Sequence, residues 1–338
     1  MAAYTSIDNP ELYFQVKAYS GTGDDNAGTD DSLALTFDGS ENMQPDLMWF
    51  KGRNFADNHV VIDSVRGVTK AVYPDSNAAE TTQSHYLKTI DSDGMTLGDS
   101  GIMNRSGRTY VAWCWKESAD SGFDIVSYTG NSTDRPISHS LSAVPKVIII
   151  KNRSTTNWWH TYHHKIGNNY EVYLNVNNAK GSTDAYQSTD PTSSVFSLDD
   201  SVDGTNGDGN SLIAYLFAEK QGFSKFGSYT GNGSSSDGTF VYTGFRPAFI
   251  LAKRTDSTDH WTLWDNKRES NPNNNVLYPS LSDAESTSDS SYLADLVSNG
   301  VKWRGTSTGM NASGANYIYM AFAEAPFVNS NGVPCNAR

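Results

Sequence analysis

The chain has 338 residues, of which 37% are hydrophobic and 19% charged, and its formal net charge is -13. An acidic chain without a basic cluster repels phosphate backbones, which argues against nucleic-acid binding. No run of about 18 apolar residues is present, so we expect no membrane insertion. The first residues have neither the basic nor the apolar region of a signal peptide, and two cysteines are too few for a disulfide framework. We therefore expect folding in a reducing cytoplasm.

Short apolar or alternating runs bounded by Gly, Asn, Asp, Ser or Pro follow one another along the chain and predict strands. The best helix signal is 290–300, which has three apolar residues on one helical face and a glycine as a stop. In 110–117 alternate residues face opposite sides, and both sides are largely apolar, so we expect a central strand with Cys114 as a small buried residue. In chain order the predicted strands cover 45–53, 110–117, 123–130, 146–153, 170–176, 194–198, 211–219 and 247–254.

Four blocks of sequence recur three times in the same order. The first is a turn, an apolar run and a final glutamate, and its copies are 103–117, 205–219 and 310–324. The second reads Pro, an apolar run, Lys and Arg, at 45–53, 145–153 and 247–254. The third, at 72–81, 172–181 and 277–286, has a glutamate that its middle copy lacks, and the fourth is Tyr-[Ser/Thr]-Gly at 19–21, 128–130 and 229–231. The recurring positions include Pro45, Pro145, Pro247, Asn104, Asn206, Asn311, Gly107, Gly209, Gly314, Glu117, Glu219 and Glu324.

The period predicts an all-β chain of three tandem repeats, since the steps between the final glutamates are 102 and 105 residues. A unit of that length is long enough to hold its own core. Its short strands and turn-rich boundaries favour an antiparallel β-sandwich, of the jelly-roll or lectin-like kind. We expect an N-terminal segment at 1–11, β-sandwich repeats at 12–118, 119–220 and 221–327, and a C-terminal tail at 328–338.

The three strand-end glutamates are candidates for glycoside hydrolysis, which needs two carboxylates facing one bond. Because Glu117, Glu219 and Glu324 end the same strand in each copy, a structural role is favoured. We expect each to meet a basic or backbone donor within its own repeat, with the Lys or Arg of the proline block as the preferred partner. The sequence predicts no catalytic residue.

Two further clusters could hold a metal. The run 160–164 contains three histidines, of which His160 and His164 would share a face of a strand. The run 199–210 begins like a calcium loop, with Asp199, Ser201 and Asp203, but its twelfth residue is Asn210 where a bidentate glutamate is wanted. A solvated histidine patch and a plain loop are the favoured interpretations, so no metal or cofactor is predicted.

Aromatic residues in corresponding segments of the second and third copies give the best candidate for ligand binding. Aromatic faces stack on the apolar faces of sugars, with polar neighbours reading the hydroxyl groups. Tryptophan in a strand is more often part of a core, which is the alternative for these residues. The candidate glycan-binding residues are Trp158, Trp159, His160, Trp261 and Trp264.

Several stretches together resemble a family of virion-associated proteins of tailed bacteriophages, especially marine ones. They are "DSVRG" (63–67), "SNAAET" (76–81), "YVAWCWK" (110–116), "GFSKFGSYTGNG" (222–233), "FVYTGFRPAFILAKRTDST" (240–258) and "YIYMAFAEAPF" (317–327). The resemblance spans about Asn9 to Phe327 and implies lectin- or glucanase-like β-sandwich modules in tail-fibre, baseplate or other virion positions. It implies no catalytic motif. Members often sit in longer fibres with an attachment domain, whereas only about 11 residues precede the first repeat here.

These observations predict a non-enzymatic virion structural protein, associated with a tail fibre or baseplate, with a host-surface glycan as its candidate ligand. The alternatives are a capsid decoration or head-fibre protein without a ligand, and a glycan hydrolase. Low apolar content for the chain's size suggests burial between subunits, so a homotrimer is expected. Its partners would be other virion proteins, and it would reach the particle by assembly in the host cytoplasm.

Overall fold

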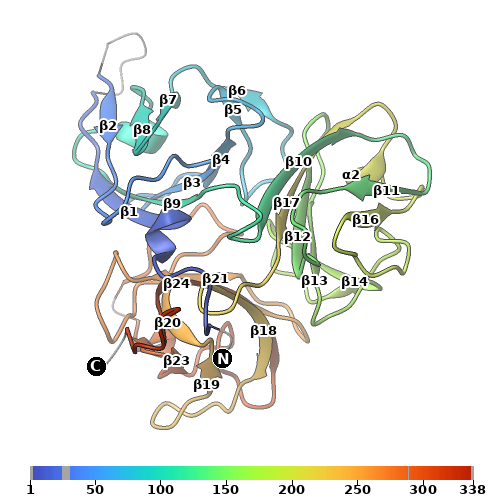
Figure 1. Ribbon diagram of the computed structural model, residues 1–338. Coiled ribbons are helices and arrows are strands. Elements are labelled where there is room, and N and C mark those ends of the chain that lie inside the picture. The colour runs from blue at the N-terminus through green and yellow to red at the C-terminus, as the bar shows by residue number, and fades with distance from the viewer. Residues whose placement is uncertain (1–2, 25–30, 288, 336–338) are drawn as a thin grey trace.

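The computed structural model describes residues 3–24, 31–287 and 289–335, and it is all-β (Figure 1). All the named strand pairs are antiparallel, as the sequence predicted, and no helix in these ranges is long and apolar enough to cross a membrane. Three lobes surround a common centre, and each contains one principal sheet with the smaller elements outside it (Figure 1).

The first lobe contains the sheet β1-β9-β3-β4, a three-stranded sheet β2-β8-β7 and the short pair β5-β6. A single 3-10 turn, η1 (Pro10–Leu12), precedes the first strand, and α1 (Gly101–Asn104) precedes β9. The strands are β1 (Phe14–Ser20), β2 (Leu33–Leu35), β3 (Leu47–Gly52), β4 (Val60–Asp63), β5 (Lys70–Ala71), β6 (Thr81–Thr82), β7 (Leu87–Asp91), β8 (Gly94–Leu97) and β9 (Thr109–Trp115).

The second lobe contains the sheet β10-β17-β12-β13-β14-β15 and the outer pair β11-β16, with α2 (Asp203–Asn206) before β17. Its strands are β10 (Phe123–Thr129), β11 (Arg135–Ser138), β12 (Val147–Asn152), β13 (Trp159–His163), β14 (Tyr170–Tyr173), β15 (Gly181–Ser182), β16 (Val195–Leu198) and β17 (Ser211–Phe217).

The third lobe contains the sheet β18-β24-β20-β21 and the outer sheet β19-β23-β22, with η2 (Ser290–Tyr292) before β22. Its strands are β18 (Ser224–Thr230), β19 (Phe240–Tyr242), β20 (Phe245–Arg254), β21 (Thr262–Asp265), β22 (Ala294–Val297), β23 (Gly300–Trp303) and β24 (Asn316–Pro326). The described parts of both chain ends lie on this lobe, where Tyr4 Oη donates to the Gly244 carbonyl at 2.7 Å and Ser330 N donates to Asp8 at 2.6 Å.

The principal sheets share one strand order over their first four strands, and corresponding residues stand at corresponding places in the register. Across the central strand pair, Leu47 faces Trp115, Val147 faces Phe217 and Phe249 faces Phe322. The recurring prolines Pro45, Pro145 and Pro247 lie two residues before the first member of each pair, and the recurring glutamates lie two residues after the second. Only at Pro247 does the pairing carry a register shift.

The central strand β9 has the two apolar faces that its alternation predicts. Val111, Trp113 and Trp115 join the core at the centre of the molecule, whereas Ala112 and Cys114 join a separate core on the outer side of the first sheet. The second and third lobes also have outer cores of their own. Each lobe therefore has a core of its own, and in addition the inner faces of the three sheets are buried against one another.

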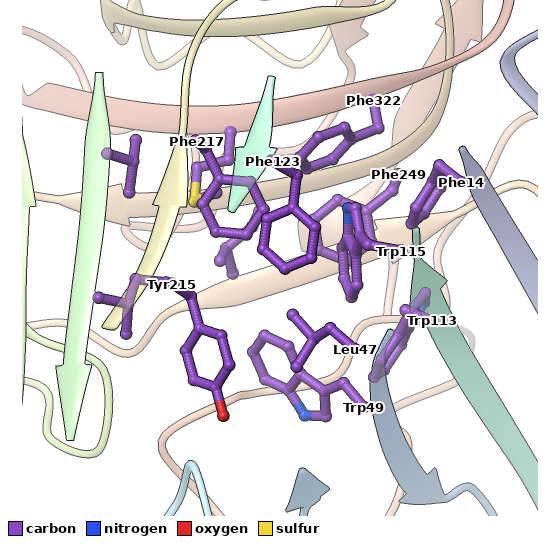
Figure 2. Close-up of a cluster of buried hydrophobic side chains, with 14 of the residues drawn as sticks. Phe14, Leu47, Trp49, Trp113, Trp115, Phe123, Tyr215, Phe217, Phe249 and Phe322 are labelled. Carbon is purple, nitrogen blue, oxygen red and sulfur yellow. The ribbon is translucent and has the colours of Figure 1, made fainter. Parts of the chain in front are cut away.

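Aromatic rings from all three lobes meet in this shared core (Figure 2). Trp115, Phe217 and Phe322 stand at corresponding positions, and their ring centroids are 5.6 to 6.4 Å apart with interplanar angles of 62 to 71°. Edge-to-face packing of this kind suits the ring quadrupoles and adds to the area that each ring buries. The shared core therefore binds the three lobes into one body.

The segment predicted as a helix, 290–300, is instead η2 followed by the first strand of the β22-β23 hairpin. Ala294 and Leu296 are buried while Asp295 and Val297 are half-buried, which is a period of two. The helical interpretation was wrong because it rested on Leu293, Leu296 and Val297, whereas the residues that the fold buries are Ala294 and Leu296, on the strand that pairs with β23 and packs against β20.

Candidate functional site

Each lobe meets the next through a junction, and we name these the 1–2, 2–3 and 3–1 junctions after the lobes they join. A fully buried lysine stands at the same register position in each: Lys151, Lys253 and Lys51, respectively. Lys151 Nζ donates to the carbonyl of Asn77 in the first lobe at 3.0 Å and to that of Asn157 in its own lobe at 2.7 Å. Burial lowers the pKa of all three lysines to about 8. The lysines are structural ties between loops.

Buried polar contacts cross the shared core at every junction. Tyr215 Oη donates to Asp63 at 2.7 Å across the 1–2 junction. His163 Nε2 lies 3.2 Å from the Tyr319 carbonyl at the 2–3 junction, and Trp113 Nε1 donates to Asp265 at 2.9 Å at the 3–1 junction. Because a buried polar group is costly without a partner, these bonds specify how the lobes are arranged.

Three of the four tryptophans proposed as a sugar platform are buried, two of them in these junctions, and this corrects the sequence prediction. Trp159 Nε1 donates to the Tyr73 carbonyl and Trp261 Nε1 to the Tyr173 carbonyl, both at 2.9 Å. Trp264 is fully buried in the core of the third lobe. A side chain without solvent access cannot stack on a ligand, so these three residues are removed from the candidate site.

Two members of the predicted platform remain, Trp158 and His160, and they differ in exposure. Trp158 is 41% exposed, and its ring centroid lies 4.6 Å from that of Tyr173. His160 is buried, and its Nδ1 lies 2.8 Å from a carboxylate oxygen of Glu171. His160 therefore supports the fold, and Trp158 alone presents an indole face to solvent.

Arginine–glutamate pairs close two of the three junctions. At the 1–2 junction, Arg153 donates to both carboxylate oxygens of Glu80, at 2.8 and 3.0 Å. At the 3–1 junction, Arg53 does the same to Glu285, at 2.8 and 3.2 Å. Bidentate geometry makes these the stronger kind of charged hydrogen bond. Glu80 and Glu285 are the recurring acidic residues of the third sequence block.

The 2–3 junction has neither member of this pair. In the other two junctions the backbone N–H of the arginine donates to the first residue of the last strand of its lobe: Arg53 N to the Thr109 carbonyl and Arg153 N to the Ser211 carbonyl. At the 2–3 junction the residue that makes this bond is Thr255, whose N–H donates to the Asn316 carbonyl. Lys180 N donates to the Thr255 carbonyl, as Glu80 N does to that of Arg153. Thr255 and Lys180 therefore occupy the arginine and glutamate positions. Aligning Arg254 with Arg153, as the repeated block suggests, is wrong by one residue because the third copy is one residue shorter.

A groove of about 450 Å³ lies at the 2–3 junction. Its lining combines two lysines, Lys165 and Lys180, with the short side chain of Thr255 and polar residues of β18 and β24. Arg254 turns away from the arginine position, and its Nε donates to Asp256 at 2.7 Å. A cavity of this size is within the range of small-ligand sites.

Two of the three strand-end glutamates bridge successive lobes rather than pairing within their own. Glu117 accepts from Ile125 N and Glu219 from Phe226 N, both at 3.2 Å, and both donors belong to the first strand of the next lobe. Glu219 also accepts from Lys225 Nζ at 2.7 Å. Only Glu324 has its basic partner, Arg246, within its own lobe, at 3.0 Å. The expectation of partners within each unit was therefore wrong for Glu117 and Glu219.

Glu117 differs from the other two because an acidic residue, Asp124, stands where the next lobe has Lys225. Burial, and after it a hydrogen bond with Asp124, raise the pKa of Glu117 to about 7. Protonation of Glu117 near neutral pH makes this junction sensitive to pH.

The recurring asparagines and glycines build one turn three times. Asn206 accepts from Asn131 N at 3.3 Å and donates to the carbonyls of Thr133 and Asp199 at 2.9 and 3.1 Å. Asn104 and Asn311 make the corresponding three-way contacts. The glycines that follow, Gly107, Gly209 and Gly314, have φ of 79, 68 and 75°, where other residues are strained.

The candidate metal residues are also occupied by the fold. His164 Nε2 lies 2.7 Å from the Phe226 carbonyl, so His160 and His164 have separate structural partners. The calcium-like run folds into α2, and Asp199 accepts from Ser201 N at 2.8 Å within a local turn. Carboxylate oxygens of Asp134, Asp199 and Asp200 lie within 4.8 Å of one another near the surface. Exposed acidic groups of this kind are common without an ion.

The chain belongs to the family described as "Domain of unknown function (DUF7483)", which matches residues 9–326. No curated protein and no solved structure matches the chain. The match covers all three lobes, so the junctions lie inside the family's own boundaries.

Sequence reasoning missed the junctions although it identified most of their residues. The Lys of the proline block was predicted as a partner of the strand-end glutamates, whereas it binds loop carbonyls of a neighbouring lobe. One signal was available: the third copy of that block is a residue shorter than the others, and the middle copy of the third block has Lys180 where the others have glutamate. Both irregularities fall at the 2–3 junction.

Proposed function

We propose that this chain is a non-enzymatic structural and adhesion protein of a tailed-bacteriophage particle, at a tail-fibre or baseplate position, and that it binds a glycan of the host surface. The observation that carries the proposal is the closed ring of junctions. Buried lysines, buried tryptophans and the strand-end glutamates Glu117 and Glu219 join lobe to lobe, which supports a rigid body. A rigid frame that presents many loops suits recognition of a surface.

The proposal includes an origin for the fold, in which three tandem β-sandwich-like repeats at 12–118, 119–220 and 221–327 were placed side by side. The shared strand order, the corresponding registers and the thrice-built Asn–Gly turn support it. Strand β1 pairs with β9 within the first lobe, as β10 pairs with β17 and β18 with β24, which agrees with these boundaries.

The non-enzymatic part of the proposal is supported by the placement of the recurrent carboxylates. Glu117 and Glu219 accept hydrogen bonds from the next lobe, and Glu324 forms an ion pair with Arg246. Hydrolysis of a glycosidic bond requires two carboxyl groups about 5–9 Å apart on either side of a substrate. The three glutamates serve the frame instead.

A homotrimer stays part of the proposal, together with contacts to other virion proteins. The low apolar content of the chain suggested that apolar surface is buried between subunits, but the shared core buries such surface between the lobes of one chain. Trimerisation would therefore rest on surface contacts. Mass measurement by light scattering at rising concentration decides between a trimer and a chain that stays monomeric.

Locating the chain on purified particles tests the role. Gold-labelled antibodies against the chain should decorate the tail end in electron micrographs, and the purified chain should bind host cells and compete with particle adsorption. Labelling over the capsid without competition would favour a decoration protein. Release of reducing ends from host polysaccharide, abolished by changing one carboxylate, would refute the non-enzymatic proposal.

A further inference from the structure

The 2–3 junction departs from the other two at two positions whose changes reinforce each other. Where Arg153 and Glu80 neutralise each other and fill the space between lobes, this junction has Thr255 and Lys180. A threonine is several atoms shorter than an arginine, and Arg254 next to it binds Asp256 instead. No guanidinium occupies this position, and a groove of about 450 Å³ lies beside Thr255 and Lys180.

The charge in this groove is positive in a chain with net charge -13. Lys165 and Lys180 line it, and neither makes an ion pair within the part of the chain that the structure describes. Among the described lining residues the acidic one is Asp256, whose carboxylate already accepts from Arg254 Nε and from Asn316 N at 3.0 Å. Two ammonium groups without a counter-charge favour an anion.

The remaining lining favours a sugar over a small inorganic ion. Ser228, Thr230 and Asn316 are exposed at the groove and offer hydroxyl and amide groups to a polyhydroxylated ligand. Tyr170 lies beside the groove and outside its lining; it is 39% exposed, and its ring centroid is 4.4 Å from the ammonium of Lys180. Polar side chains beside an aromatic ring are the elements from which saccharide sites are built.

We propose that the groove at the 2–3 junction binds an anionic saccharide, with Lys165 and Lys180 holding its carboxylate or sulfate groups. This deepens the proposed adhesion function by naming the ligand class, and it rests on that function only for its biological role. Carboxylate and sulfate groups are both anions that lysines bind, so the experiment uses one carboxylated and one sulfated saccharide to tell them apart.

The test is calorimetric titration of the whole chain with an oligogalacturonate, a sulfated carrageenan oligosaccharide and neutral maltotriose. At least one anionic saccharide should bind more than about tenfold more tightly than the neutral one, and the affinity should fall as NaCl rises. Equal affinity for all three, or no binding at millimolar concentration, overturns the proposal. The stronger anionic arm identifies carboxylate or sulfate as the natural group.

A double variant, Lys180→Glu with Thr255→Arg, rebuilds the pair that closes the other two junctions. It should lose at least about tenfold in affinity for the anionic saccharide while its melting temperature is unchanged or raised. The matched control is Lys88→Gln at an exposed lysine outside the groove, which lowers the net charge by one, as the double variant does, and should bind as the native chain does. Native affinity in the double variant, or an equal loss in the control, refutes the assignment.

The single variants Lys165→Gln and Lys180→Gln change exposed side chains, so they keep the test decisive should the double variant fail to fold. Each should weaken binding about threefold or more. Native affinity in both overturns the proposal. The two proposals can fail separately: saccharide binding with the chain absent from virions would refute only the virion role, whereas a chain at the tail tip without saccharide binding would refute only the groove.

Discussion

The phenyl ring of Phe217 lies in the shared core and contacts all three lobes. We therefore expect Phe217→Ala to weaken the packing of all three lobes. Phe217 is buried, and its ring centroid lies 4.7 Å from that of Phe123, 6.4 Å from that of Trp115 and 5.8 Å from that of Phe322. Truncation of a buried phenylalanine costs about 3–5 kcal/mol, because transfer and cavity contributions add. The lost contacts involve all three lobes.

At about 2.1 cal/mol/K per residue, a loss of about 4 kcal/mol lowers the melting temperature of a chain this size by about 6 °C. Hydrogen exchange followed by mass spectrometry locates the effect. In the variant, peptides from β9 in the first lobe and β24 in the third should exchange faster, as well as peptides from β17, because the three sheets open together.

The matched control is Phe196→Ala, which removes an equally buried ring from the outer core of the second lobe. It should cost a similar free energy, but its faster exchange should stay within the second lobe. If Phe217→Ala leaves β9 and β24 protected, the shared core does not couple the lobes, and the reasoning fails.

Three further outcomes follow from the junctions and the exposed indole. Glu117→Gln should stabilise the chain at pH 8 by about 1 kcal/mol, after discounting for its half-exposed position, since burial and Asp124 raise the pKa of Glu117 to about 7. A carboxyl group whose pKa is raised in the folded state stabilises the fold fully below about pH 4.5, and this stabilisation is lost as the pH rises through 7. Thermal melts of Glu117→Gln should therefore show no gain at pH 4.5. A gain that does not depend on pH would contradict this. Arg153→Met should cost about 2 kcal/mol in urea unfolding, because it leaves Glu80 with a weakened set of partners in a mostly buried position; an unchanged midpoint would show that the 1–2 junction does not depend on the pair. Trp158→Ala should leave the melting temperature within about 1 °C but weaken binding to host cells, and unchanged binding would remove this indole from the adhesive surface.

Local pattern was sufficient for the strands and their faces. In 110–117 the alternation of Val111, Trp113 and Trp115 with Ala112 and Cys114 assigns the side chains to two apolar environments, and the structure has both. The recurrent Asn–Gly turn was likewise readable, because a residue in the left-handed region and a side chain that bonds the backbone are local requirements. At 290–300 the local pattern failed, since three apolar residues suggested a helix where pairing with β23 and packing against β20 form a strand.

The sequence by itself determined that this is an all-β chain with corresponding residues at a regular period. Only the tertiary structure decided what those residues contact, because a period states which positions are alike and not which units meet. Lys151 and Lys51 became ties between lobes, and Trp159 and Trp261 became buried donors, through carbonyl groups more than 70 residues away in sequence. Lys180 stands in the glutamate position of the third sequence block, and the sequence alone gives this substitution no consequence. In the fold Lys180 faces the third lobe, where it lines the groove at the 2–3 junction.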